Sequence, residues 1–194
     1  VVTKDLSDAL HAALDNPLLD QMPANMNWFF NEWIYNAGQP EFKVDYTYDE
    51  SSKEIVLNAK QVQRMDSSSV FKTPVPIEII TETGRQSITM ETSADVKTYK
   101  IKVDSKPLNI NFNKGNKVLC KLYFSKPKND WMYQLNNSPD AIDRLTALNG
   151  LKDFLNDDEV VIAIKDKMRN DSFWGVRCEA VKVLSTSKNK AVTE

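Results

Sequence analysis

Apolar and polar residues alternate along the whole length of the segment Phe42-Lys43-Val44-Asp45-Tyr46-Thr47-Tyr48. Successive side chains of a β-strand point to opposite faces, so this alternation predicts a strand with one buried and one solvent-facing side. Six further segments have strand patterns, and the loop 49–53 joins the first two as a hairpin. The predicted strands are 42–48, 54–59, 75–80, 87–91, 99–103, 108–112 and 118–124.

Seven short strands separated by turn residues are typical of a β-sandwich, and we predict an antiparallel one over residues 39–127. One face of each sheet would form the core, and the polar alternate face would look to solvent. Pro76 lies within the third strand. Because proline has no N–H to donate to a neighbouring strand, it predicts an edge position for that strand.

Residues 1–38 form a predicted helical segment. Four apolar residues recur at the spacing of one helix face, namely Leu6, Ala9, Leu10 and Ala13. Asn16-Pro17 interrupts this pattern, and a second helix is expected after Pro23, carrying the aromatic run 28–35. Gly38 would stop that helix and Pro40 would prevent its continuation.

Residues 128–194 return to the helical period. Ala141, Leu145, Leu148 and Leu151 mark one helix face. Further helices are predicted at 160–168 and 176–184, and the segment 142–148 aligns with 175–181 as a weak internal repeat. Helical pairs that recur at this spacing are typical of an α-solenoid of HEAT type. The predicted fold class is therefore α+β, with a seven-strand sandwich between a short helical segment and HEAT-like helices.

Composition excludes several functions for the 194-residue chain. Its 25 Lys and Arg against 27 Asp and Glu give a net charge of −2, which argues against a general nucleic-acid binder. No stretch approaches the ~20 apolar residues that cross a bilayer. The start at Val1 lacks the basic and apolar parts of a signal peptide, so we interpret the sequence as a mature or excised fragment and leave its compartment open.

The residues that carry chemistry are sparse. His11 is the one histidine, and Cys120 and Cys178 lie far apart in the sequence, whereas a catalytic zinc site takes three protein ligands dominated by His or Cys. The sequence also lacks both GxxxxGK[ST] and GxGxxG phosphate-binding patterns. We therefore predict no catalytic, cofactor-binding or metal-binding residue here, and no enzymatic activity of this chain by itself.

The run Trp28-Phe29-Phe30-Asn31-Glu32-Trp33-Ile34-Tyr35 followed by Gly38-Gln39-Pro40 resembles the end of the catalytic domain in aminopeptidase-N-type zinc peptidases. In that family an aromatic helix closes with a Trp and a Gly-x-Pro before a β-sandwich begins. Val2-Thr3-Lys4-Asp5-Leu6 with Ala9-Leu10 resembles the penultimate helix of the same domain. Residues 170–177 with Glu179-Ala180 are similar to the helical region of its bacterial members.

The resemblance implies a non-catalytic C-terminal portion of a zinc aminopeptidase, which acts as spacer and support for the catalytic domain. The family's H-E-x-x-H, its distant Glu and its catalytic Tyr lie upstream of the helix matched by residues 5–14, so zinc is expected in the missing upstream domain. The catalytic domain is then the expected intramolecular partner, and residues 1–38 could also mediate self-association. The alternative is a protein-binding scaffold of the same architecture that lacks the zinc site. An independent adhesin or sugar binder is a third possibility.

Several residues have both a structural and a functional interpretation. His11 is expected to be a solvated or half-buried helix residue. The aromatic run 28–35 is expected to be core that packs partly against the catalytic domain, although it could be a ligand groove. Arg177 is expected to hydrogen-bond a neighbouring helix end or Asp171, and otherwise to grip an anionic partner.

Three further groups have alternatives. The aromatic residues Trp131, Tyr133 and Trp174 would stack on sugars in a carbohydrate-binding protein. The acidic run 157–159 suggests either a helix start or a calcium site, and it lacks EF-hand spacing. Cys120 and Cys178 are expected to be free thiols at packing positions.

Overall fold

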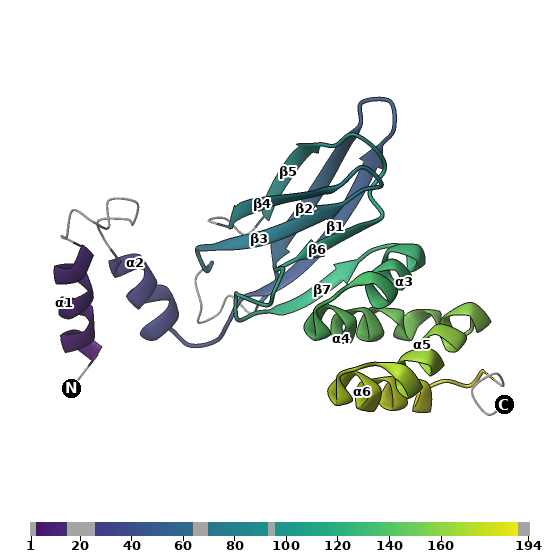
Figure 1. Ribbon diagram of the computed structural model, residues 1–194. Helices are drawn as coiled ribbons and strands as arrows, with labels where there is room; N and C mark the ends of the chain where they lie inside the picture. Colours follow the sequence, from purple (N-terminus) through teal and green to yellow (C-terminus); the bar gives the residue numbers. More distant parts are fainter. Residues whose placement is uncertain (1–2, 15–25, 64–69, 93–95, 190–194) are drawn as a thin grey trace.

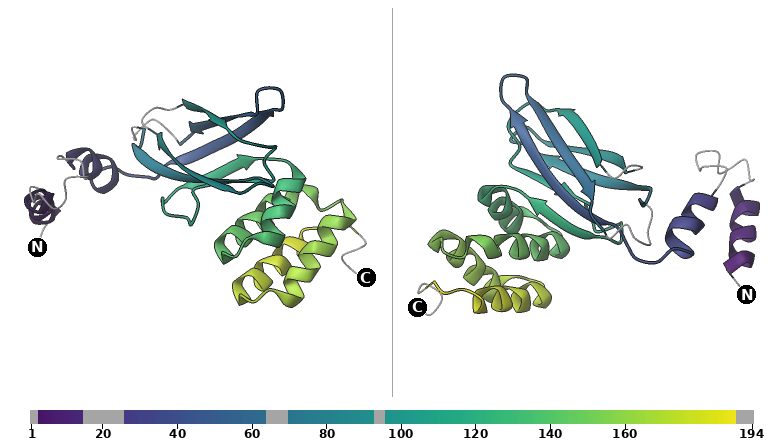
Figure 2. Two further views of the ribbon diagram at one scale, coloured as in Figure 1. Left: turned by 45° about the horizontal axis from the view of Figure 1, so that its top comes forward. Right: turned by 180° about the vertical axis from the view of Figure 1, so that it is seen from behind.

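A computed structural model describes residues 3–14, 26–63, 70–92 and 96–189. The chain is mixed α and β and runs through three successive parts (Figure 1). The helices α1 (Thr3–Leu14) and α2 (Asn27–Phe29) come first, followed by seven strands and then by four further helices. In all three views of Figures 1 and 2 the first two helices stand apart from the sheets, whereas the last four gather against one side of them.

The strands form two sheets that face each other in a sandwich-like arrangement. The four-stranded sheet has the order β5-β2-β1-β7 and the three-stranded sheet has the order β4-β3-β6. The strands are β1 (Glu41–Asp49), β2 (Glu54–Gln61), β3 (Thr73–Ile80), β4 (Arg85–Thr92), β5 (Val96–Lys102), β6 (Asn109–Phe112) and β7 (Lys121–Ser125).

The alternation in β1 has the predicted consequence. Phe42 and Val44 are buried, whereas Lys43 and Asp45 are exposed. Phe42 reaches across to the other sheet, where its ring lies 5.4 Å from that of Phe112. Each such side chain contributes roughly 1.5–3 kcal/mol when it is buried, so the shared apolar core holds the two sheets together.

The expectation of a wholly antiparallel sandwich was wrong for one strand pair. β1 and β7 are parallel, with a register that runs from Glu41 opposite Lys121 to Asp45 opposite Ser125. Parallel neighbours need a long connection, and here the intervening five strands supply it. As a result, the strand that leads into the helical part lies beside the strand that follows the N-terminal helices.

Pro76 does not mark an edge strand, because β3 lies between β4 and β6. The pairing with β6 covers only Ile77 to Ile80, and Pro76 lies just before it. There the Pro76 carbonyl accepts a hydrogen bond from the Lys114 N–H (2.9 Å). The short β6 thus leaves the Pro76 nitrogen without a partner strand. A proline is tolerated at such a position because its nitrogen has no hydrogen to donate.

The aromatic run is not one regular α-helix. α2 has three residues and continues as a π-helical turn, η2 (Phe30–Ile34), closed by a hydrogen bond from the Tyr35 N–H to the Phe30 carbonyl (2.9 Å). Gly38 follows shortly after this turn, at φ 94°, a conformation that favours glycine. The predicted break at Asn16-Pro17 and the predicted start after Pro23 lie outside the described residues.

The last four α-helices form two pairs around a second apolar core. They are α3 (Lys128–Asn137), α4 (Ala141–Gly150), α5 (Asp158–Asn170) and α6 (Trp174–Ser185), with the 3₁₀ turn η3 (Leu151–Phe154) between the pairs. Residues 128–137 lie within the region predicted to be helical, but no separate bounds were predicted for α3, whose residues are mostly polar. The ends of α3 and α5, and the starts of α4 and α6, are separated by the same interval as the aligned segments 142–148 and 175–181.

Candidate functional site

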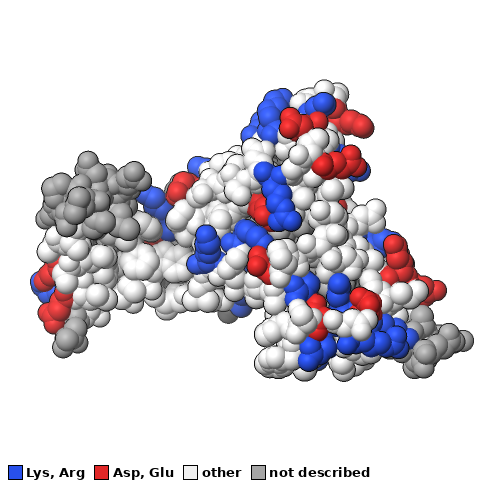
Figure 3. All heavy atoms as spheres, in the orientation of Figure 1, with Lys and Arg blue, Asp and Glu red and all other residues white. Residues whose placement is uncertain are grey.

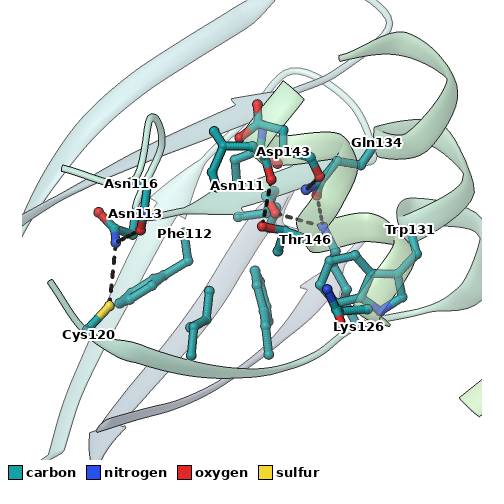
Figure 4. A pocket seen from close by; sticks show the side chains of 15 residues that line it. Asn111, Phe112, Asn113, Asn116, Cys120, Lys126, Trp131, Gln134, Asp143 and Thr146 are labelled. Carbon is teal, nitrogen blue, oxygen red and sulfur yellow. Dashed lines mark hydrogen bonds between the residues drawn. The ribbon is translucent and has the colours of Figure 1, made fainter. Parts of the chain in front are cut away.

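A cavity of about 320 Å³ lies where the sheets meet the helices (Figure 4). Strands β6 and β7 supply one wall and helices α3 and α4 the other. Its polar lining includes Asn111, Lys126, Gln134, Asp143 and Thr146. It is therefore a first place to look for bound ligand or catalysis.

Lys126 is the buried cation of this junction. Its Nζ donates to Asn109 Oδ1 (2.6 Å), to the Ile110 carbonyl (3.1 Å) and to Gln134 Oε1 (2.5 Å). The same ammonium group lies 3.9 Å from the centre of the Trp131 ring. Burial lowers the pKa of Lys126 to about 7, against the attraction of the Asp130 and Asp143 carboxylates.

The partners of Lys126 correct the prediction that the polar face of each strand looks to solvent. Asn109 and Asn111 in β6 are both buried, because α3 covers this face. Asn109 donates to Asn111 (2.9 Å), and Asn111 donates to Glu78 Oε2 (2.9 Å). The polar residues of β6 therefore bond within the junction instead of facing water.

A second basic residue crosses the junction. Lys114 forms ion pairs with Asp140 (2.6 Å), with Asp143 and with Glu78 (3.8 Å). Burial alone would lower the pKa of Lys114, but the hydrogen bonds to Asp140 and Asp143 outweigh it and hold that pKa above its usual value. Lys114 thus connects the loop after β6 to the start of α4.

The remaining acid of the junction, Asp130, accepts a hydrogen bond from the Tyr46 hydroxyl. Burial raises the pKa of Asp130, while the bond from Tyr46 and the charge of Lys126 oppose that shift. Burial and the neighbouring Asp130 also raise the pKa of Tyr46. Perturbed acids and bases of this kind often mark active sites.

Here, however, the polar groups are already occupied by one another. All three protons of the Lys126 ammonium have acceptors within the protein, and Gln134 both accepts from Lys126 and donates to the Asp143 carbonyl (2.8 Å). Within the described ranges, Ser105 Oγ is the one buried side-chain polar atom without a partner. A fully bonded polar network specifies how two parts pack, so we interpret this junction as structural.

A second hollow, of about 710 Å³, lies beside the N-terminal helices. We call it the aromatic groove; its apolar lining is Met26, Trp28, Phe29, Trp33, Pro74, Val118 and Leu119. Trp33 belongs partly to the sandwich, because its ring lies 5.1 Å from that of Phe71 and its Nε1–H donates to the Lys72 carbonyl (3.2 Å). The side chain of Leu119, by contrast, is 70% exposed.

The apolar stripe predicted for α1 is also largely uncovered. Leu6, Ala9 and Ala13 are exposed and Leu10 is half-buried. His11 was expected to be solvated or half-buried, and it is half-buried. Its Nε2 accepts a hydrogen bond from the Met26 N–H (3.3 Å). His11 therefore links α1 to the start of α2.

The structure places the other singled-out residues at structural positions. Arg177 donates to the carbonyls of Asp171 (2.8 Å) and Ser172 (3.4 Å), which confirms the predicted contact with a helix end. Asp157 caps α5 by accepting from the Glu159 N–H (3.0 Å), and both acids hold Lys128. The acidic run therefore is a helix start.

Trp131 is buried in the helical core, so its ring is not accessible for stacking on a sugar. Tyr133 is half-buried on the same helix, and Trp174 is exposed on α6. Cys120 and Cys178 are free, as predicted. Cys120 is half-buried, and burial raises the pKa of its thiol, whereas the exposed position of Cys178 contradicts the expected packing site.

Neither metal nor membrane features appear in the described part of the chain. Residues 3–14, 26–63, 70–92 and 96–189 bring together no group of three His, Cys, Asp or Glu side chains that could hold a metal ion. Among the same residues no helix has the length and apolar character to span a bilayer. Figure 3 shows Lys and Arg side chains mixed with Asp and Glu over the sandwich and helices.

The fold defines the chain as a sandwich-like β unit joined to paired helices, and this arrangement occurs in a peptidase. Among solved structures, Legionella pneumophila aminopeptidase A, determined in complex with aspartic acid, matches with a TM-score of 0.58 and 12% sequence identity. The match covers 81% of this chain but only 21% of that one, so the chain spans about a fifth of its structural neighbour. No family model and no curated protein matches the sequence.

Proposed function

We propose that the chain is a non-catalytic part of a zinc aminopeptidase of the aminopeptidase-N type, in which it supports the catalytic domain. Three features support this: the likeness of its fold to part of an aminopeptidase, the Trp33-to-Pro40 segment that leads into the sandwich, and the bonded junction between sandwich and helices. The family assignment and the zinc of the upstream domain belong to the proposal.

The observation that carries the proposal is the uncovered apolar surface of residues 3–13 and 26–35. The helices α1 and α2, which carry the exposed stripe and part of the groove lining, stand on the far side of the sheets from α3 to α6 (Figure 2). An apolar surface of this kind marks a contact site for another protein unit. In the proposed function that unit is the catalytic domain, and the sandwich holds the groove in place through Trp33.

The chemistry of the proposed parent follows from its metal. A zinc ion bound upstream would activate a water molecule for removal of N-terminal residues from peptides. The described residues of this chain do not fit such an ion, because they bring no suitable ligand set together. Its residues would have a structural role: they would hold the aromatic groove in place and make the junction between the sandwich and the helices α3 to α6 rigid.

The test compares residues 1–194 with the natural polypeptide that includes the sequence upstream of Val1. The longer polypeptide should bind one equivalent of zinc and hydrolyse an aminoacyl-anilide in a chelator-sensitive way, and residues 1–194 should do neither. A longer polypeptide without zinc that still binds proteins through the groove would favour the alternative, a scaffold of the same architecture. Stoichiometric zinc in residues 1–194 would contradict both.

A second measurement tests the groove. Trp28→Ser with Leu119→Ser should weaken binding of a separately produced catalytic domain by at least ~10-fold, because both side chains line the groove. Trp174→Ser is the matched control, since Trp174 is an exposed aromatic residue on α6. Equal losses for groove and control variants would show that the groove is not the contact site.

A further inference from the structure

Strand β7 is an outer strand of its sheet, and its free edge carries unpaired backbone groups. The Lys121 N–H donates to the Pro40 carbonyl (3.0 Å), so Lys121 directs its backbone groups toward β1. Successive residues of a strand direct these groups to opposite sides, and Leu122 and Phe124 therefore direct theirs away from β1. Within the described residues, no hydrogen bond joins the outward N–H and C=O groups of Leu122 and Phe124 to another residue. An edge of this kind can pair with a further strand.

The other three outer strands are better protected. The Glu91 N–H in β4 donates to the Tyr99 hydroxyl (3.0 Å). Helix α3 covers β6, whose Ile110 carbonyl accepts a hydrogen bond from Lys126 (3.1 Å). In β5 three of the seven residues are lysines, and lysines on an outer strand oppose its pairing with another chain. The centre of β7 is apolar and aromatic instead.

A hollow lies on each side of this edge of β7. The first is the junction cavity of about 320 Å³, lined by Leu122 and Phe124, whose side chains pack on the core of the sandwich; we call it the inner hollow (Figure 4). The second has a volume of about 460 Å³, and its lining adds the exposed side chains of Tyr123 and Ser125, together with Lys43; we call it the outer hollow. Helix α4 lines both hollows, so they form one groove between β7 and α4.

The two hollows differ in chemistry. The inner hollow has the aromatic side chains of Phe112, Phe124 and Trp131, and its polar side chains are bonded within the protein. The outer hollow has Lys43 of β1 and Asp153 of η3, and within the described chain neither of these two residues forms an ion pair. An occupant that complements both hollows therefore has apolar side chains on its inner side and charged side chains on its outer side.

We propose that the edge of β7 binds an extended peptide segment of another polypeptide, in which apolar and charged residues alternate. The segment pairs its backbone with Leu122 and Phe124, and it places successive side chains in the inner and the outer hollow in turn. Its charged residues pair with Lys43 and Asp153. The main-chain hydrogen bonds supply affinity, and the two hollows select the alternating pattern. This inference goes beyond the proposed peptidase-related function and does not depend on it.

The test uses the 194-residue chain and a capped octapeptide in which valine alternates with lysine and glutamate. Isothermal titration calorimetry should give a one-to-one complex with a dissociation constant below ~1 mM. A peptide of the same composition with its valines in one block is the matched control and should bind at least ~10-fold more weakly, because it cannot fill the two hollows in turn. Equal binding of the two peptides, or no binding of the alternating one, overturns the proposal. Self-association of the chain that blocks the peptide would assign the edge to a second copy and also overturns it.

Methylation of peptide nitrogens tests the backbone pairing. Methyl groups on two alternate nitrogens that face β7 should weaken binding at least ~10-fold, because each removes a hydrogen bond, whereas methyl groups on the two nitrogens that face away should not. In antiparallel pairing the valine nitrogens face Leu122 and Phe124, and in parallel pairing the nitrogens of the charged residues do, so the sensitive set also gives the orientation. Equal effects of the two sets would show that the peptide does not pair with the edge, and the proposal would be wrong.

A variant of the chain tests the outer hollow. Asp153→Lys reverses the charge of one wall and should weaken binding of the alternating peptide at least ~3-fold, with an unchanged unfolding midpoint because Asp153 is exposed. Glu82→Lys is the matched control, since Glu82 is an exposed acid between β3 and β4 and lines neither hollow. The same loss of affinity in both variants overturns the assignment of the peptide to this groove.

Discussion

Arg144 and Asp171 form a buried ion pair with two hydrogen bonds, Nε to Oδ2 at 2.7 Å and Nη2 to Oδ1 at 2.9 Å. Asp171 also accepts a hydrogen bond from the Phe173 N–H at the start of α6 (2.9 Å). One carboxylate therefore connects α4, the end of α5 and the start of α6. The pair therefore links the first helical pair to the second, and breaking it would leave an uncompensated buried charge.

Removing one charge of this pair should be costly. Arg144→Met leaves Asp171 buried without its cation, and we expect the free energy of unfolding to fall by about 3–5 kcal/mol in urea titrations. Arg177→Met, the control, loses only hydrogen bonds to carbonyls and should cost about 1 kcal/mol. A similar decrease in the free energy of unfolding for the two variants would show that the ion pair stabilises the fold no more than the hydrogen bonds to carbonyls do.

The same pair predicts a pH dependence. Burial alone would raise the pKa of Asp171, but the hydrogen bonds from Arg144 and the Phe173 N–H outweigh it and hold the pKa below its usual value. A carboxylate with a lower pKa in the folded chain stabilises it above the unfolded pKa of about 3.9, and this stabilisation is lost as the pH falls through the folded pKa. The difference in unfolding free energy between wild type and Asp171→Asn should therefore shrink between pH 6 and pH 3. A constant difference would contradict the shift.

Lys126 should make the free energy of unfolding depend on pH in the alkaline range. Burial lowers its pKa to about 7 in the folded chain, so between pH 7 and its unfolded value of about 10.4 the unfolded chain binds more protons. Stability then rises with pH in this window, by at most about 1.4 kcal/mol per pH unit. Measured against Lys126→Met at each pH, the wild type should gain stability from pH 7 to pH 10. A flat difference would show that the ammonium keeps an ordinary pKa.

The strands of the sandwich-like part could be predicted because the signal for a strand is local. Phe42 and Val44 alternate with polar residues, and burial follows that alternation. The parallel pairing of Glu41 with Lys121 could not be predicted, because it joins residues far apart in sequence and depends on the order of all seven strands. The edge strand predicted from Pro76 was wrong, because β3 lies between two strands and only the shortness of β6 leaves the Pro76 nitrogen without a strand partner.

The junction was missed for a different reason. Asn109 and Asn111 have the alternation of a solvent-facing strand side, and only the covering helix α3 makes that side buried. Residues 128–137 were predicted as part of the helical region, but their mostly polar sequence shows no apolar face that would define α3. Lys126, directly before Pro127 at the start of α3, gives no sign in the sequence that it is buried. Arg177 was predicted correctly because its acceptors lie within one repeat.

Gly150 gives a test of the packing at this junction. A Cβ added there would overlap the Trp131 ring, so Gly150→Ala should displace Trp131 from its place over Lys126. Overpacking of this kind costs about 1–3 kcal/mol, measurable as a lower urea midpoint. Asn149→Ala, at an exposed position of the same helix turn, is the control and should change little. An unchanged midpoint for Gly150→Ala would mean that the ring has room to move.

The aromatic groove predicts the behaviour of the isolated chain. Trp28 and Phe29 line the groove and contact each other, whereas Trp33 packs on Phe71 of the sandwich and bonds the Lys72 carbonyl. Burying such a side chain is worth roughly 1.5–3 kcal/mol, so the groove should favour self-association when no other domain covers it. Trp28→Ser with Phe29→Ser should then reduce any dimer seen by sedimentation while barely moving the unfolding midpoint of the β-region. Trp33→Ser should instead lower that midpoint, because it removes a contact within the sandwich. Loss of the folded β-region in the double variant would show that α2 belongs to the sandwich core.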